Sequence, residues 1–513
     1  MRRATLHADT IVVGAGSAGC VIASRVSERS DHDVLVLDAG PDYPSARPDD
    51  LRDGTRNSYQ RHDWGFRHRP SERSLAAVPM PRGRVVGGSS AVNTCIALRG
   101  VPADYDEWAE RGLREWSWSR CLPAFRRLER DLDFGARDPE IHGDRGPLPI
   151  RRAREDELVP WQRAYRDACL AMGFAPVDDH NRPGALGVGA HAMNVIDGVR
   201  QDAASCWLSP EVRARRNLRI HDHTLVHRVR IEGSRVRGVD VERNGVVHTI
   251  SARRVVLSAG ALATPGILLR SGIGPREELA RLGVRRVRDV PAVGAQLLDH
   301  PGTAVFCWPR APMRSDVHGP LIQVALRLRS ARSRFDGDLQ LQAGSFWFFP
   351  IGRGVALPGV GVMMHVGKPV GTGELLHPSA DPRDAPIVRS RFFADARDRD
   401  VAIEGLMLAR EICETAPLRG AHRFVWPREH VLRDRARIDA MLPAHCDSGY
   451  HPCGTVPMGD ALDGHGRIDG IEGLHVADAS IMPTIPTANI HLAVLMIGER
   501  FGAWLRDGFD SDS

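Results

Sequence analysis

The chain has 513 residues, of which 42% are hydrophobic and 26% charged, as is ordinary for a globular protein. This length leaves room for two or three domain-sized units and a large buried core. The formal charge of +5, from 69 basic and 64 acidic residues, is small beside the total and gives no reason to expect a nucleic-acid partner.

The cysteines and the N-terminus indicate where such a chain would reside. The nine cysteines are scattered singly, with no CxxC pair and no compact framework, which favours reduced thiols in a cytoplasm. The N-terminus enters a strand pattern by Thr10 without the apolar stretch and cleavage site of a secretory signal. No apolar run approaches the length of a membrane span. We therefore expect a cytoplasmic protein with no membrane span.

The first recognisable unit is a strand, a helix and a second strand near the N-terminus. The apolar run 11–13 precedes a GxGxxG turn made by Gly14, Gly16 and Gly19, and the second strand ends at Asp38. In this motif the glycines allow a tight turn, the approach of a pyrophosphate and close packing of helix on strand. The helix N-terminus would face the phosphates, and Asp38 would accept hydrogen bonds from a ribose. The pattern predicts dinucleotide binding without saying which dinucleotide.

Later segments change in character along the chain. Strand-like runs separated by Gly and Asn turns fill 217–274 and include the apolar strand 255–257. From about 310 to 440, alternating strand patterns, Pro-rich loops and a helix-like stretch indicate a second domain of sheet and helices. Near the C-terminus, a short strand and a Pro-containing loop lead to Asn489, which we expect to be the N-cap of a buried helix.

The segment YHPCGTVPMG, residues 450–459, contains a histidine, His451, whose role local sequence leaves open. A metal site could use His451 with the nearby His445, Cys446 and Cys453, but their spacing matches no zinc pattern, so no metal is expected. A nucleophilic Cys453 has no supporting signature. A catalytic base and a histidine simply held in a loop by hydrogen bonds both stay open at this point.

Two longer motifs give His451 a context. Residues 83–108, GRVVGGSSAVNTCIALRGVPADYDEW, resemble the first signature of the glucose-methanol-choline (GMC) family of flavin oxidoreductases, and residues 260–274, GALATPGILLRSGIG, resemble the second. The N-terminal GxGxxG, the HxxGT at 451–455 and the DAS at 478–480 follow in family order. The motifs run through most of the chain and are weakest in the second domain, so the chain is identified as a member of this family.

The resemblance implies an α/β fold with a Rossmann-like FAD-binding domain and a second, α+β substrate-binding domain. The FAD-binding domain would be discontinuous and would comprise residues 1–158, 215–305 and 445–513. The substrate-binding domain would comprise residues 159–214 and 306–444.

The resemblance also implies which residues hold FAD. The expected contacts are Gly14, Gly16, Ser17, Ala18 and Gly19 at the pyrophosphate, Asp38 at the ribose, Trp64 near the cofactor, Val86, Gly87, Gly88, Ser90 and Asn93 against the isoalloxazine, Val226 at the adenine, and Asp478 and Ala479 in a second region. Asp38 stands where the family usually has Glu, so its ribose contact would be longer or bridged by water. Val92 stands where some members attach FAD through His, so we expect non-covalent FAD.

For catalysis, the resemblance adds His491, where choline-oxidising members have Asn and some other members have His. Oxidation of an alcohol removes a proton from oxygen and a hydride from carbon, and flavin N5 accepts the hydride. Histidine, with an ordinary pKa of about 6.5, can take the proton near neutral pH. We expect His451 to be the base and His491 to hold the substrate oxygen, unless His491 is only a packed helix residue. The dipole of its helix would stabilise negative charge on the reduced flavin.

The expected reaction is oxidation of a small primary alcohol to an aldehyde, with oxygen or another electron acceptor. The alternatives are a non-redox or light-driven reaction on the same fold, as in hydroxynitrile lyases and photodecarboxylases, and a flavin-binding protein without turnover. Choline is disfavoured because no cluster of acids or aromatics indicates a quaternary ammonium site. Phe346, Trp347, Phe348 and Phe349 either line an apolar substrate pocket or belong to the core of a sheet.

Overall fold

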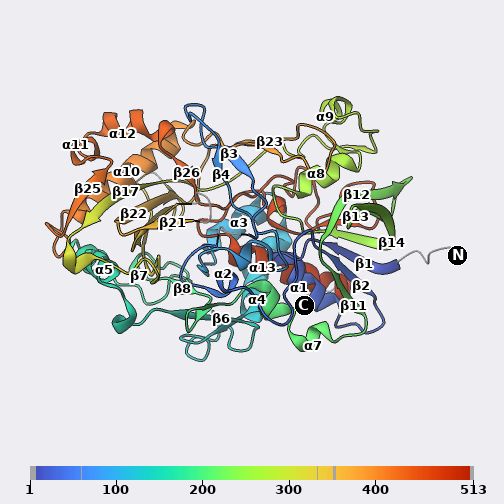
Figure 1. Ribbon diagram of the computed structural model, residues 1–513, viewed down its shortest axis with the longest axis horizontal. Helices are drawn as coiled ribbons and strands as arrows, with labels where there is room; N and C mark the ends of the chain where they lie inside the picture. Colours follow the sequence, from blue (N-terminus) through green and yellow to red (C-terminus); the bar gives the residue numbers. More distant parts are fainter. Residues whose placement is uncertain (1–6, 59–60, 332, 350–353, 509–513) are drawn as a thin grey trace.

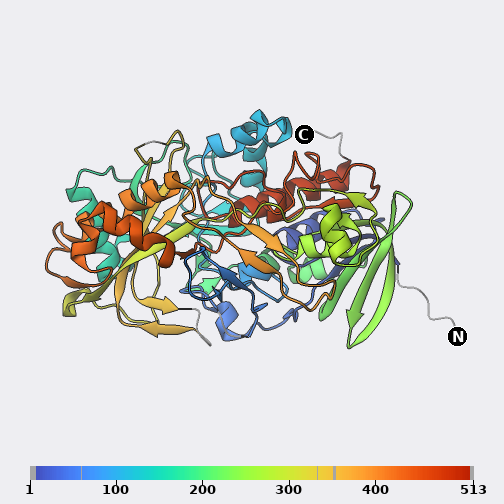
Figure 2. The same ribbon diagram turned by 90° about the horizontal axis from the view of Figure 1, so that it is seen from above.

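The computed structural model describes residues 7–58, 61–331, 333–349 and 354–508 (Figure 1). The outer ends of the predicted FAD-binding segments, 1–6 and 509–513, and residues 350–353, which follow the four aromatic residues at 346–349, lie outside these ranges. In Figures 1 and 2, two large sheets lie toward opposite ends of the long axis, and helices α1 (Ser17–Val26) and α13 (His491–Asp507) lie between them.

The first sheet contains the predicted strand–helix–strand unit. Its strand order is β11-β2-β1-β14-β13-β12, and β27 also pairs with β14. These strands are β1 (His7–Val13), β2 (Val34–Leu37), β11 (Leu218–His221), β12 (Thr224–Glu232), β13 (Arg235–Arg243), β14 (Val246–Leu257) and β27 (Leu474–Val476). The pairs β1–β2, β2–β11, β1–β14 and β14–β27 are parallel, and every residue of β2 is buried, as is typical of a central parallel strand. The expected strands at 11–13, 34–37 and 255–257 are all present.

The second sheet is antiparallel and carries helices. Its order is β25-β17-β22-β19-β18-β7, and β26 also pairs with β17. These strands are β7 (Gly187–Ala190), β17 (Pro301–Pro309), β18 (Val324–Leu328), β19 (Leu339–Gly344), β22 (Val360–Val366), β25 (His422–Trp426) and β26 (Asp447–Ser448). Helices α5 (Pro160–Ala171) and α10 (Ala396–Cys413) pack against it and share its apolar core. The combination of a nucleotide-binding α/β sheet and a helix-covered antiparallel sheet confirms the predicted fold class.

Shorter elements complete the described part of the chain. The other helices are α2 (Asp49–Arg52), α3 (Pro102–Glu110), α4 (Trp118–Leu128), α6 (Ala203–Trp207), α7 (Pro210–Arg213), α8 (Thr264–Arg270), α9 (Arg276–Arg281), α11 (Glu429–Leu432) and α12 (Arg435–Met441). The other strands used below are β3 (Arg67–Arg69), β4 (Val78–Pro79), β20 (Trp347–Phe349) and β21 (Val355–Leu357). Among the described residues, no helix has both the length and the apolar character that crossing a membrane requires.

Helix α13 lies against α1 at two glycines. A Cβ at Gly498 would stand 2.9 Å from the carbonyl oxygen of Ala18, and a Cβ at Gly502 would stand 2.7 Å from the Cβ of Arg25. Any larger residue at these positions would push the helices apart, because neither contact leaves room for a side chain. The two glycines therefore set the distance between the helix that begins at the GxGxxG turn and the helix that begins at His491.

The predicted N-cap of α13 is wrong. The helix begins at His491 with Ile490 in the cap position, and no side chain makes a cap hydrogen bond there. The side chain of Asn489 instead lies 3.0 Å from the ring of His451, measured from Nδ2 to Nε2. A residue type that often caps helices is thus used here for a contact with His451.

Candidate active site

One cavity of about 1070 Å³ runs between the two sheets. Its wall includes the turn before α1, the ends of β1 and β2, and β12 on one side, and β17, β19 and β22 on the other. Binding pockets for small molecules commonly enclose about 300–1000 Å³, so this cavity has room for a dinucleotide together with a small substrate. Both His451 and His491 line it, as does the GxGxxG turn.

The three glycines of the turn meet different surroundings. Gly14 has a φ of +93°, and a Cβ there would stand 2.5 Å from the carbonyl oxygen of Ser258. A Cβ at Gly19 would stand 1.9 Å from the carbonyl oxygen of Gly14. Gly16 lines the cavity, and its Cβ would meet no protein atom closer than 3.9 Å. The first two glycines are therefore required by the fold itself, whereas the bare backbone at Gly16 fits the approach of a pyrophosphate.

The loop of the first signature closes over this turn. A Cβ at Gly88 would stand 2.6 Å from the Cα of Gly16, so the two loops touch through backbone alone. Behind this contact the amide of Gly87 donates to the carbonyl of Ala15 at 2.7 Å, and the amide of Val86 donates to the carbonyl of Pro41 at 3.0 Å. Of the predicted cofactor residues, Gly19, Val86 and Gly87 lie behind the cavity wall and hold its shape. The members that line it are Gly14, Gly16, Ser17, Ala18, Asp38, Trp64, Gly88, Ser90, Asn93, Val226, Asp478 and Ala479.

Asp38 lies at the end of β2, where the ribose contact is expected. Its Oδ2 accepts from the amide of Ala15 at 2.9 Å, and its Oδ1 accepts from the amide of Gly40 at 2.8 Å. Burial raises the pKa of Asp38 to about 6, although both backbone amides favour its ionised form. Each carboxylate oxygen has a second lone pair, so the side chain that braces the turn can also accept from a hydroxyl in the cavity.

Asp478 joins the second signature to the DAS segment. Its Oδ2 accepts from the hydroxyl of Thr264 at 2.6 Å and from the amide of Gly260 at 2.9 Å, and its Oδ1 accepts from the amide of Ser480 at 2.8 Å. A buried carboxylate is stable only when hydrogen bonds replace its water, and three of them do so here. Asp478 therefore connects two motifs that are distant in sequence, and both form the same part of the cavity wall.

His451 is held by hydrogen bonds on both ring nitrogens. Its Nδ1 lies 2.9 Å from Nδ1 of His300, and its Nε2 lies 3.0 Å from Nδ2 of Asn489. Its backbone amide donates to Oδ1 of the neighbouring Asp299 at 2.9 Å. His300 and Asn489 were not expected at the site. His300 has no motif around it that would single it out, and the capping preference of Asn489 concealed its side-chain role.

The partners of His300 determine which nitrogen of His451 carries the proton. Nε2 of His300 lies 2.9 Å from the carbonyl of Pro486, which can only accept, so this nitrogen is protonated. Burial and nearby His365 lower the pKa of His300 to about 3, so the ring is neutral at pH 7 and its Nδ1 is an acceptor. Nδ1 of His451 must then donate to it. The lone pair of His451 is therefore on Nε2, where it accepts the hydrogen bond that Nδ2 of Asn489 donates.

His451 and His491 are also neutral. Burial, followed by the charges of His300, His365 and Arg82, lowers the pKa of His451 well below its ordinary value. Burial and the charge of Arg200 lower the pKa of His491 to about 4. A neutral imidazole can accept a proton, which an imidazolium cannot.

His491 lines the same cavity from the first turn of α13. Its Nδ1 lies 3.5 Å from the hydroxyl of Ser17, which is a long hydrogen bond, and its Nε2 is buried without a partner among the described residues. Oδ1 of Asn489 is likewise buried without such a partner. Unpaired buried polar atoms are costly, so groups of this kind at a cavity wall point to a ligand that completes them.

The aromatic stretch lines the cavity at the second sheet. Phe346 is 2% exposed, and the three aromatics of β20 that follow it are partly exposed. Phe306 of β17 packs on Trp347 with ring centroids 5.7 Å apart. All of these rings belong to the cavity wall near the loop that carries His451. The pocket alternative for this stretch is thus favoured over a purely internal role.

Cys453 is unsuited to nucleophilic chemistry. It is fully buried, and burial, followed by the charge of Asp299, raises the pKa of its thiol well above the ordinary value. A thiol that stays protonated is a poor nucleophile. Of the alternatives for the segment, a catalytic base at His451 agrees best with the surroundings.

Comparison with known proteins agrees with these motifs. A family model described as GMC oxidoreductase matches residues 8–302, and a second model with the same description matches residues 369–498. The chain is 33% identical to 5-(hydroxymethyl)furfural oxidase from Methylovorus sp., with 96% of this chain and 97% of that protein covered. It is also 33% identical to oxygen-dependent choline dehydrogenase from Vibrio vulnificus, with 96% and 93% covered.

A solved structure of a similar protein has the same overall fold. Pyridoxine 4-oxidase from Mesorbium loti is 30% identical and superposes with a TM-score of 0.87, with 96% of this chain and 98% of that chain covered. The family is one of flavin enzymes, and the residues around Gly16, Asp38 and Asp478 fit its cofactor, FAD. The chain belongs to the glucose-methanol-choline family and is an FAD-dependent oxidoreductase.

Proposed function

We propose that the enzyme oxidises a primary alcohol to an aldehyde, with His451 as the base. The observation that carries this proposal is the lone pair on Nε2 of His451, placed at the cavity wall by the hydrogen bonds of His300. The names of the relatives agree with an alcohol substrate, since they include a 5-(hydroxymethyl)furfural oxidase, a choline dehydrogenase and a pyridoxine 4-oxidase.

The side chains divide the work around the substrate oxygen. Nε2 of His451 takes the hydroxyl proton, and the positive charge that results is shared through Nδ1–H with His300 and then with the carbonyl of Pro486. When the hydroxyl replaces the amide of Asn489 at Nε2 of His451, Nε2 of His491 and the released amide would hold the oxygen in place. FAD supplies the hydride acceptor when it is bound. Electrons then leave to oxygen or to another acceptor.

We further propose that FAD is held without a covalent bond. Val92, which is 6% exposed, lines the cavity at the position where some relatives attach the flavin, and its side chain offers no nucleophile. The substrate would be an aromatic or other apolar alcohol, because aromatic rings form much of the wall at the second sheet.

The test is an anaerobic visible spectrum of the purified holoenzyme before and after addition of pooled aliphatic and aromatic primary alcohols. Bleaching of the flavin band together with formation of an aldehyde supports the proposal, and dividing the pool identifies the substrate. The contrary result is a flavin that stays oxidised with every alcohol while the enzyme converts another substrate, in the dark or under illumination. That result would favour the non-redox or light-driven reaction.

The Gly16→Ala variant should fold but bind FAD about 10- to 100-fold more weakly, since the added methyl group enters the space expected for the pyrophosphate. The retained flavin is measured from the visible absorbance of the purified protein and from titration with FAD after its removal. Gly319→Ala, outside the cavity, is the control and should retain FAD. Full retention of FAD by Gly16→Ala would contradict the placement of the pyrophosphate.

The rate of flavin reduction should stay constant as the pH is lowered through about 6.5, the ordinary pKa of histidine. The base works only when deprotonated, and the pKa of His451 is lowered well below that value, so protonation begins at a more acid pH. The measurement is anaerobic stopped-flow reduction between about pH 5 and 9, with holoenzyme stability recorded at each pH. A fall in rate centred near pH 6.5 would contradict the environment assigned to His451.

A further inference from the structure

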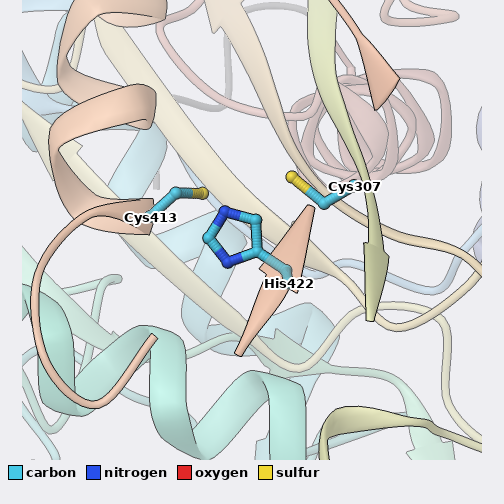
Figure 3. Close-up of side chains that lie close together, drawn as sticks. All are labelled: Cys307, Cys413 and His422. Carbon is cyan, nitrogen blue, oxygen red and sulfur yellow. The ribbon is translucent and has the colours of Figure 1, made fainter. Parts of the chain in front are cut away.

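Three donor side chains gather on the side of the second sheet that faces away from the active-site cavity. They are Cys307 in β17, Cys413 at the end of α10 and His422 at the start of β25. Their ligand atoms all lie within 4.8 Å of one another. Figure 3 shows the imidazole of His422 between the side chains of Cys413 and Cys307, with the sulfur of Cys413 directed toward the ring.

The sheet separates this cluster from the substrate. Phe306 and Cys307 are consecutive residues of β17, so their side chains point to opposite faces. Phe306 lines the active-site cavity, and Cys307 belongs to the apolar core under α5 and α10. Trp161 of α5 packs edge-on against His422 with ring centroids 5.8 Å apart. The cluster is therefore separate from the active-site cavity.

The histidine is oriented as a ligand. Nδ1 of His422 lies 3.1 Å from the carbonyl oxygen of Leu418, so this nitrogen carries the proton and Nε2 has the lone pair. A backbone carbonyl on the second nitrogen is the usual support for a metal-bound histidine. Both cysteines are fully buried and reduced.

A second group of possible ligands, Glu129, Asp131 and His142, does not offer a comparable site. Burial alone would lower the pKa of His142, but hydrogen bonds to Asp131, Asp179 and Glu129 raise it to about 10. Both ring nitrogens are then protonated and cannot bind a metal. Ion pairs with Arg99 and Arg152 already neutralise the carboxylates.

We propose that Cys307, Cys413 and His422 bind one Zn²⁺ ion. Zinc ligands at about 2.0–2.3 Å in a tetrahedron lie about 3.5–3.8 Å apart. The ligand atoms, which lie within 4.8 Å of one another, therefore need to close by about 1.3 Å at most. The ion binds two thiolates and Nε2, and the two thiol protons leave to solvent. The site has no net charge, which makes it compatible with the apolar core around it.

Solvent reaches this position from the surface. Cys413 and His422 are among the residues that line a groove of about 600 Å³. It gives the ion an entry path and provides a water molecule for the fourth position. The ion would join α10 to β17 and β25 directly behind Phe306. Its role would be to fix the aromatic wall of the substrate pocket, independently of the chemistry at His451.

The experiment measures zinc in the holoenzyme produced in zinc-supplemented medium and freed of loosely bound metal by gel filtration. We expect about one zinc per chain, and zinc-edge X-ray absorption should show two sulfurs at about 2.3 Å and nitrogen or oxygen at about 2.0 Å. The zinc content per chain of the Cys307→Ala and Cys413→Ala variants should in each case be at least about tenfold lower than that of the wild type. Cys121→Ala, which removes another fully buried thiol, should keep it.

The zinc-edge X-ray absorption spectrum of the wild-type enzyme tests the proposal even if a variant fails to fold. A zinc-free wild type after this treatment would overturn the proposal. So would zinc that persists in both cluster variants, or a first shell without sulfur. A disulfide between Cys307 and Cys413 would overturn it as well. It would be seen after denaturation and alkylation without reductant as a cross-linked pair of peptides that lack the alkyl group at both cysteines.

Discussion

His451→Ala is expected to slow anaerobic reduction of the flavin by the true substrate about 10²- to 10⁴-fold while FAD stays bound. Nε2 carries the lone pair of the neutral ring, which accepts from the amide of Asn489 until the substrate hydroxyl replaces it, so loss of the side chain removes the base but not the cofactor contacts. Stopped-flow absorbance under anaerobic conditions measures the rate directly, without the later step of reoxidation.

The control for this prediction is His248→Ala, an exposed histidine on β14, which should reduce the flavin at the normal rate. Added imidazole should restore part of the activity of His451→Ala, because the vacated space opens on the cavity. Near-normal reduction in His451→Ala would show that another group is the base. Loss of FAD from the variant would show that the side chain is structural.

Two substitutions at His300 separate its role in positioning from mere packing. In His300→Leu, Nδ1–H of His451 loses its acceptor, the ring is free to exchange tautomers, and reduction should slow about 10- to 100-fold. In His300→Asn, an amide oxygen can take the place of Nδ1 and accept the same hydrogen bond. The asparagine variant should therefore keep most of the activity that the leucine variant loses.

The measurement is again the rate of anaerobic reduction, now with its dependence on pH and on substrate concentration. His300→Leu should lower the maximal rate more than the apparent affinity for substrate and should change the pH profile of reduction. Equal rates in the leucine and asparagine variants would mean that the acceptor at this position does not select the tautomer. The melting temperatures of both variants, measured with FAD bound, control for loss of stability.

The sequence could predict the parts of the site that depend on backbone. Gly14, Gly16 and Gly19 have conformational requirements that few other residues meet, so their spacing alone indicates the turn. The strands beside them are apolar runs whose burial follows from hydrophobicity. These features are local, and local sequence is enough to identify them.

The parts that escaped prediction depend on contacts between distant segments. His300 lies 151 positions from the ring that it orients, and Asn489 lies 38 positions from it. Asn489 also had a plausible local role as a helix cap, which the structure does not use. Val86 and Gly87, which are expected at the flavin, donate their backbone amides to Pro41 and Ala15, and local sequence does not reveal such contacts.

The contact between α1 and α13 joins the GxGxxG turn and His491 in one rigid unit. Ala18 and Arg25 belong to the helix that follows the GxGxxG turn, and Gly498 and Gly502 belong to the helix that starts at His491. A side chain inserted between them, well away from the substrate, would tilt one helix against the other and misalign two sites at once. An enzyme altered in this way would carry every catalytic residue and still be inactive.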